Sequence, residues 1–246
     1  MQIKQQIHSI EQAKTYHTNQ PEQFKQLLEI DDLTFDYLNG TDLYLFQKKK
    51  MFRNNTDTAS LGTFLQVKPS ESVLDIGTNN GALLLYASQY HPASLCGVEL
   101  QEEACELATY NLSLYGLNAN IIHSNIKEVQ DIKADVIISN PPYFASPDKR
   151  VAETSRNIAR HEFFLDLETL IACIHRLISE NGRCYIVHRA DRITDIITLF
   201  QKYAMEVKQI QFIYDEAKQD ARSVLVEARR HGKPGCKVLK PIILTR

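Results

Sequence analysis

Residues 72–81 read Ser-Val-Leu-Asp-Ile-Gly-Thr-Asn-Asn-Gly, and the apolar segment 82–90 follows directly. An apolar run, a glycine-containing turn and a second apolar segment predict a buried strand, a tight loop and a helix. The dinucleotide fingerprint G-x-G-x-x-G is absent, because Asn79 stands two residues after Gly77. In that fingerprint the second glycine lets the backbone approach a pyrophosphate closely. A ligand without a pyrophosphate does not need this glycine. Asn79 and Asn80 can adopt left-handed backbone angles at lower cost than most residues.

The next predicted strand, residues 95–98, is followed by Glu99. An acidic residue one strand further along the chain is typical of folds that bind ribose hydroxyl groups. Taken alone, a turn glycine or a surface glutamate would explain Gly77, Gly81 or Glu99. Together with Asp75 at the end of the first strand, these residues predict a nucleoside site.

A second loop, Asn140-Pro141-Pro142-Tyr143-Phe144, follows the β-branched run 135–139. Proline cannot donate to a sheet ladder and fixes φ, so the chain leaves the strand stiffly at its carboxyl end, where ligands of open α/β sheets bind. Asn140 offers an amide oxygen, Pro141 a backbone carbonyl and Tyr143 an aromatic face. This combination suits a planar group that carries an NH2. The alternative, that Asn-Pro-Pro is only a turn, stays open for the tripeptide alone.

Asp75–Gly81 and Glu99 resemble motif I and the ribose-binding acid of class I S-adenosylmethionine (SAM)-dependent methyltransferases. Asn140–Tyr143 resembles motif IV of the members that methylate exocyclic or amide nitrogens. The resemblance implies SAM as cofactor, contacted by Asp75, Gly77, Asn79, Gly81, Glu99 and Asn140. In that family the next strand usually ends in an Asp that contacts the adenine amino group. Here Asn125 follows residues 121–124, and its amide oxygen can accept the same hydrogen bond without a charge.

Two further segments, Phe52–Thr58 and Ala159–Glu162, are similar to those of the bacterial tRNA(Val) adenine-37 N6-methyltransferases. The resemblance covers roughly residues 33–245 and implies methyl transfer to N6 of an adenine in tRNA. It implies catalytic roles for Asn140, Pro141, Pro142 and Tyr143, with Phe144 as a wall of the base pocket. Two alternatives stay open: methylation of a protein glutamine amide, which the same loop would serve, and a SAM-binding protein that escorts RNA without catalysis.

Basic residues flank this loop in the sequence and recur near the carboxyl terminus. Such clusters are usually solvated faces, but together they predict a rim that contacts phosphates. The residues expected to bind substrate are Lys149, Arg150, Arg160, His161, Arg229 and Arg230. His161 is otherwise simply the start of a helix, and no second ligand stands at a metal spacing, so no metal is expected. Asp57 is expected to cap a helix, to place a carboxylate near a cationic ligand and so to bind the cofactor, or to do both.

Strands and helices alternate along the chain and end in an antiparallel pair, which predicts an α/β Rossmann-like sheet of seven strands with helices on both faces. Asn39-Gly40 between two strand-like runs predicts a hairpin before this sheet. The predicted strands cover residues 72–76, 95–98, 121–124, 135–139, 183–187, 207–214 and 223–228. We expect a helical arm over residues 1–32 and a methyltransferase domain over residues 33–246.

The totals fit a globular protein: 246 residues, 43% hydrophobic and 24% charged, with a net charge of −2 that argues against indiscriminate nucleic-acid binding. Five scattered cysteines form no C-x-x-C pair, which favours reduced thiols in a cytoplasmic protein. No apolar run reaches the length of a membrane span. The expected partner is tRNA, without a membrane or a metal, and the expected assembly is a monomer or weak dimer.

Overall fold

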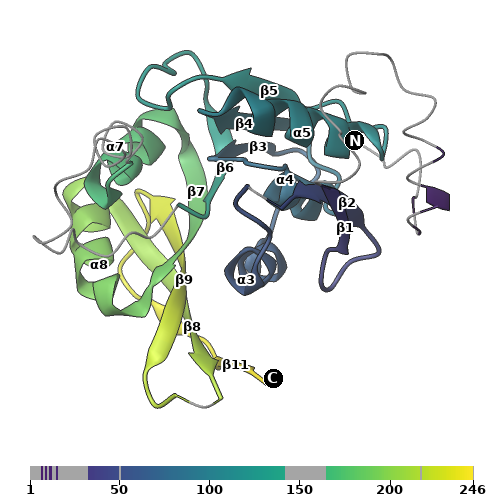
Figure 1. Ribbon diagram of the computed structural model, residues 1–246. Helices are drawn as coiled ribbons and strands as arrows, with labels where there is room; N and C mark the ends of the chain where they lie inside the picture. The colour runs from purple at the N-terminus through teal and green to yellow at the C-terminus, as the bar shows by residue number, and fades with distance from the viewer. Residues whose placement is uncertain are drawn as a thin grey trace, which may run out of the picture.

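A twisted sheet of nine strands forms the centre of the computed structural model (Figure 1). The structure describes residues 7, 9, 11, 12, 15, 33–49, 51–141, 165–216 and 218–245. The strand order is β10-β8-β9-β7-β6-β3-β4-β5, and β11 pairs with β8. The strands are β3 (Ser72–Ile76), β4 (Ser94–Glu99), β5 (Asn120–His123), β6 (Ala134–Ser139), β7 (Ile178–Arg189), β8 (Met205–Asp215), β9 (Ala221–Arg230), β10 (Lys237–Val238) and β11 (Ile242–Leu244).

The five strands from β3 to β7 run parallel, and β9 pairs antiparallel with both β7 and β8. Each of the seven predicted strands is present, and the mixed α/β architecture is confirmed. The two short strands β10 and β11 were not predicted. They add two and three residues beside β8, too few for a periodicity that the sequence could reveal.

Two groups of helices cover the two faces of the sheet, as the alternation of buried strand residues requires. On β3, Val73 packs with one core and Leu74 with the other. The first core contains α3 (Thr56–Phe64), α4 (Ala82–Ser88) and α5 (Glu102–Ser113), and the second contains α7 (Leu167–Leu177) and α8 (Ile193–Lys202), which follows the short 3-10 helix η2 (Ala190–Arg192). In Figure 1 the two groups lie on opposite sides of the ribbon of strands.

The predicted hairpin is present as β1 (Leu33–Tyr37) and β2 (Tyr44–Lys48), which pair outside the central sheet. Two buried side chains in and just after α5 form hydrogen bonds with backbone N–H and C=O groups on the edge of β2 that does not pair with β1. The Tyr115 hydroxyl accepts from Tyr44 N and donates to Tyr44 O, both at 2.7 Å. The Asn111 amide accepts from Phe46 N at 2.8 Å and donates to Phe46 O at 2.9 Å. The hairpin is therefore docked by its backbone, which fixes the segment that follows it.

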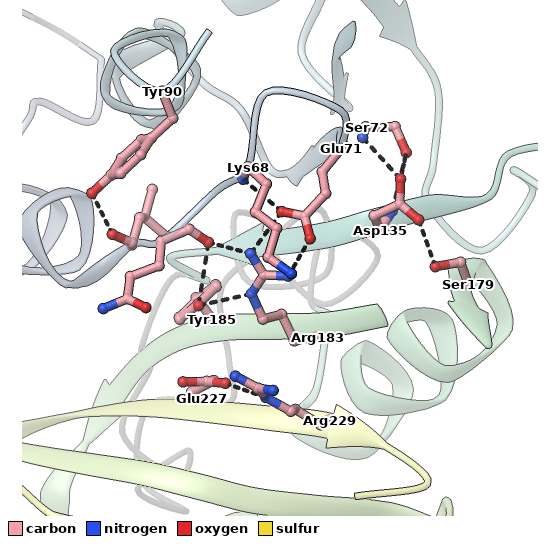
Figure 2. A network of polar contacts seen from close by, with 12 residues as sticks. Lys68, Glu71, Ser72, Tyr90, Asp135, Ser179, Arg183, Tyr185, Glu227 and Arg229 are labelled. Atoms are coloured by element: carbon pink, nitrogen blue, oxygen red, sulfur yellow. Dashed lines mark hydrogen bonds and ion pairs between the residues drawn. The ribbon is translucent and has the colours of Figure 1, made fainter. Parts of the chain in front are cut away.

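A polar network fastens the amino-terminal edge of the sheet (Figure 2). The Arg183 guanidinium donates to both carboxylate oxygens of Glu71, at 2.8 and 2.7 Å, and to the carbonyl of Gln66. The hydrogen bonds from Arg183 outweigh burial and lower the pKa of Glu71. Nearby, Asp135 accepts from Ser72 and Ser179 and so links β6 to its neighbours. These contacts hold the edge opposite the predicted site.

Among the described residues no helix is both long and apolar enough to cross a bilayer. The cysteines are free thiols, and Cys105, Cys173 and Cys184 are buried.

Candidate active site

A cavity of about 480 Å³ opens at the carboxyl ends of β3, β4 and β6, the edge where open α/β sheets bind ligands. Its wall combines the loop after β3, the ends of β4, β5 and β6, and the segment before α3. The lining residues include Met51, Phe52, Asn54, Thr58, Gly77, Asn79, Glu99, Asn125, Lys127, Ser139, Asn140 and Pro141. The two predicted motifs, separated by some sixty residues in the sequence, thus share one pocket.

The loop after β3 has the backbone that its residues predict. Gly77 and Gly81 have φ of 75° and 82°, and Asn79 has φ of 48°, the left-handed region that asparagine tolerates. A Cβ on Gly81 would stand 3.3 Å from the Cα of Ala108, so glycine also permits close packing against α5. Gly81 lies behind the pocket wall, whereas Gly77 and Asn79 line the pocket.

Asp75 supports this loop from beneath and does not line the pocket. It is completely buried, and its Oδ2 accepts from the Thr78 hydroxyl at 2.8 Å. Burial, with a smaller contribution from the charge of Glu99, raises the pKa of Asp75 to about 7. Asp75 thus contacts the loop after β3 through Thr78, whereas the sequence predicted direct contact between Asp75 and the cofactor.

Glu99 ends β4 with its carboxylate held by backbone N–H groups. Oε2 accepts from Asn79 N at 2.9 Å, and Oε1 accepts from Leu100 N at 2.8 Å and from Gln101 N at 3.0 Å. The carboxylate has about four acceptor positions, so three donors leave one, on Oε2, for a ligand. Glu99 lines the pocket and is only 9% exposed, which suits the predicted ribose role.

Asn140, directly after β6, lines the pocket together with Pro141. Its Nδ2 donates to the Thr58 hydroxyl at 2.9 Å, so α3 meets the predicted catalytic loop here. Asn125 lies in the wall beyond β5, and its Oδ1 accepts from Lys127 N at 3.0 Å. Pro142, Tyr143, Phe144, Lys149, Arg150, Arg160 and His161 lie outside the described residues, so their predicted roles stay predictions.

The structure corrects both predictions for Asp57. The helix cap is Asn55, whose side chain accepts from Thr58 N, and Asp57 lies in the first turn of α3. The Asp57 carboxylate is buried and accepts from Arg222 and Ser223 of β9, each at 2.9 Å. It does not line the pocket. Asp57 therefore fastens α3 to β9, and the cap of α3 is supplied by Asn55 instead.

The predicted rim position of Arg229 and Arg230 is wrong. Arg229 pairs with Arg183 in the amino-terminal half of β7, and Figure 2 shows Arg229 beside Glu227, which it contacts at 2.6 Å. Arg230 contacts Glu180 and donates to the carbonyls of His175 and Ile178. Because β9 runs antiparallel to β7, its last residues lie at the edge away from Asn140. The sequence shows the charges but not the direction of β9.

The segment Met51–Asn54 forms a pocket wall that the sequence did not predict. The hairpin positions it: the Gln47 amide oxygen accepts from Asn54 N at 2.5 Å and from Asn80 Nδ2 at 3.2 Å. Asn79 Nδ2 donates to the carbonyl of Phe52 at 2.7 Å. Phe52 lines the pocket and is 57% exposed, so an aromatic residue stands at the opening.

Three observations agree with SAM as the ligand. The volume lies within the roughly 300–1,000 Å³ of small-molecule sites. The buried Oδ1 of Asn54, in the pocket wall, has no hydrogen-bond partner among the described residues, as expected of an acceptor that a polar ligand completes. A Cβ on Gly77 would meet no protein atom within 4 Å, so the space above the loop is open. No cluster of metal-binding side chains occurs in the part of the chain that the structure describes.

Comparison with known proteins supplies the family. The family model of the methyltransferase small domain matches residues 46–211. The tRNA1(Val) (adenine(37)-N6)-methyltransferase of Pedobacter heparinus is 30% identical over 182 residues, 70% of this chain and 76% of the relative. The enzyme of the same description from Phocaeicola vulgatus is 28% identical over 198 residues, 77% of this chain and 82% of the relative.

The crystal structure of the M. jannaschii tRNA m1G37 methyltransferase is similar in fold, with a TM-score of 0.61 and 19% identity over 82% of this chain and 55% of that chain. The predicted class I methyltransferase fold, the methyltransferase activity and SAM as methyl donor are confirmed by these matches. From the matched domain and the extent of the similarity, this chain belongs to the methyltransferase small domain family and, within it, to the tRNA1(Val) (adenine(37)-N6)-methyltransferases.

Proposed function

We propose that this chain transfers the methyl group of SAM to the exocyclic N6 of an adenine in tRNA, at position 37 beside the anticodon. The relatives are described as acting on that base. The single observation that carries the proposal is the placement of Asn140 and Pro141 in the same pocket as Gly77 and Glu99. A nucleoside-binding edge and two acceptors for an amino group stand together there.

The protein's part in the reaction is to orient a weak nucleophile. The N6 lone pair of adenine is delocalised into the ring. We assign Asn140 Oδ1 and the carbonyl of Pro141 as acceptors of the two N–H bonds, which favours a geometry with the lone pair directed at the methyl donor. Bound SAM supplies a methyl carbon on a positively charged sulfur and leaves as S-adenosylhomocysteine. The new C–N bond makes the nitrogen acidic, so its proton passes to solvent without a strong base.

Orientation of this kind can supply about 7–11 kcal/mol of the barrier. The two acceptors contribute only if each is held in place before the base arrives. Pro141 is buried and its ring restricts the backbone, and Asn140 is anchored by α3. An adenine stacked in an anticodon loop must be turned out to reach them.

Positive charge is available at the same edge of the molecule. Lys127 and Arg53 line the pocket, and Arg222, at the start of β9, lies beside α3. Arg53 and Arg222 are paired with Asp36 and Asp57, so the unscreened charge is modest. This fits a specific RNA substrate better than indiscriminate binding, which needs many free cations.

The test is incubation of the purified chain with isotopically labelled SAM and unmodified tRNA transcripts, followed by nucleoside analysis by mass spectrometry. We expect N6-methyladenosine in one or a few tRNAs, and its absence from a matched transcript with guanosine at position 37. Label in protein glutamine and none in any tRNA would replace this proposal with the glutamine alternative. SAM binding without transfer to either substrate would favour the RNA-escort alternative.

A further inference from the structure

The side chain of Asn140 has two ends that differ chemically but are almost equal in shape. Only the oxygen can accept an N–H of the target amino group, and the NH2 would repel it. The Asn140 amide must therefore be held in one of its two orientations. In the structure its Nδ2 donates to Thr58 Oγ1 at 2.9 Å, across more than eighty residues of sequence.

The neighbours of Thr58 set this orientation. Asn55 caps α3, and its Oδ1 accepts from the backbone N–H of Thr58 at 3.0 Å, which identifies that end of Asn55 as the oxygen. The Thr58 hydroxyl donates to the same oxygen at 3.2 Å. A hydroxyl has one proton, so when it donates to Asn55 it can only accept from Asn140. The end of Asn140 that faces Thr58 is consequently NH2, and the oxygen occupies the other end.

We propose that Thr58 is a positioning residue, which with Asn55 holds the Asn140 amide so that its oxygen is presented to the substrate amino group. This inference rests on the proposed function. The helix-capping oxygen of Asn55 thereby also sets the direction of a hydrogen bond in the active site. Thr58 is only 6% exposed and lines the pocket, so its hydroxyl has little access to solvent as an alternative partner.

The principal variant is Thr58→Val, which removes the hydroxyl but keeps the shape of the side chain. It also keeps the backbone N–H of residue 58, which donates a hydrogen bond to Asn55 Oδ1. The matched control is Thr63→Val on the same helix, where an exposed hydroxyl donates to Ser60 O. We expect kcat for tRNA methylation to fall about tenfold in Thr58→Val, as suits the loss of one hydrogen bond of about 1–1.5 kcal/mol. Thr58→Ser should stay within about twofold of the wild type, and the Kd of SAM should change little in every variant.

A double variant separates positioning from general stability. In Asn140→Asp both ends are oxygens, so no orientation has to be selected. Thr58→Val should then lower kcat by less than about twofold relative to Asn140→Asp alone, because coupled residues are not additive. An equal tenfold loss in both backgrounds would show that Thr58 does not act through the amide, and would overturn the proposal. So would a kcat of Thr58→Val equal to that of Thr63→Val.

A second readout needs no activity. In protein with 15N in its asparagine side chains, the NH2 signal that disappears in Asn140→Asp belongs to Asn140. Its hydrogen exchange should be faster in Thr58→Val than in the wild type or in Thr63→Val. Unchanged exchange would overturn the assigned hydrogen bond. A wild-type protein that methylates no tRNA adenine would refute the proposed function separately.

Discussion

Replacing Glu99 with glutamine changes one atom and tests the assignment of the ribose site. The wild-type carboxylate accepts three backbone N–H groups, from Asn79, Leu100 and Gln101. Glutamine has a single oxygen. Its better orientation keeps that oxygen on the side of Leu100 and Gln101, where two donors meet it, and turns NH2 toward Asn79. The NH2 group of the glutamine therefore replaces Oε2, the carboxylate oxygen that has an acceptor site left for the ligand.

Two consequences follow, and each has a magnitude. The ribose hydroxyl loses a hydrogen bond to a charged acceptor, typically about 1.5–3 kcal/mol, which corresponds to roughly a 10- to 150-fold rise in the Kd of SAM. The Asn79 N–H now faces another donor. An unsatisfied buried donor costs about 1–3 kcal/mol, so the free energy of unfolding should fall by that amount.

Isothermal titration calorimetry with SAM and with S-adenosylhomocysteine measures the first effect, and urea unfolding without ligand measures the second. Glu102→Gln is the matched control, because Glu102 is exposed in the first turn of α5, three residues further along. A Glu99→Gln protein that is destabilised but binds SAM as tightly as Glu102→Gln would refute the ribose assignment. It would leave Glu99 with the purely structural task of holding the loop.

Three further predictions concern other parts of the molecule. Asn140→Ala should lower kcat by roughly 10²–10³-fold, the usual effect of losing one preorganised polar group, with the Kd of SAM nearly unchanged in calorimetry; normal turnover would contradict the catalytic assignment. Folding raises the pKa of Asp75 from 3.8 to about 7, so the stability of the wild type should fall as pH rises through that range. The unfolding free energy of Asp75→Asn relative to the wild type, measured by urea unfolding, should therefore rise by up to about 1.4 kcal/mol per pH unit. A stability difference independent of pH would show that folding does not raise the pKa of Asp75. Arg183→Met leaves the Glu71 carboxylate without its buried partner and should cost about 3 kcal/mol of unfolding free energy, with SAM affinity unchanged; a loss of SAM affinity instead would contradict the separation of this edge from the site.

Local patterns predicted the framework of the site well. The turn around Gly77, the acid at the end of β4 and the loop after β6 all depend on short-range chemistry: left-handed angles, proline geometry and the alternation of apolar residues. Parallel strands then bring their carboxyl ends to one edge, so Glu99 and Asn140 could be expected to share a pocket before any contact was known.

Errors arose where a residue's role depends on its neighbours in space. Asn55 and Asp57 are both acceptable helix caps, and the helix began one residue after Asn55. Asp57 instead accepts a hydrogen bond from Arg222, which stands 165 positions further along the chain. Arg229 and Arg222 look equivalent in the sequence, and the antiparallel direction of β9 places them at opposite edges of the sheet.

The sequence by itself therefore determined the fold class, the conformation of the loop after β3 and the placement of Asn140 and Pro141 directly after β6, because these depend on intrinsic backbone preferences and on periodic burial. Only the tertiary structure decided which charges reach the pocket, that the hairpin supplies one of its walls, and that Thr58 meets Asn140. Those outcomes depend on strand direction and on contacts between distant segments, whose geometry is set when the whole core packs.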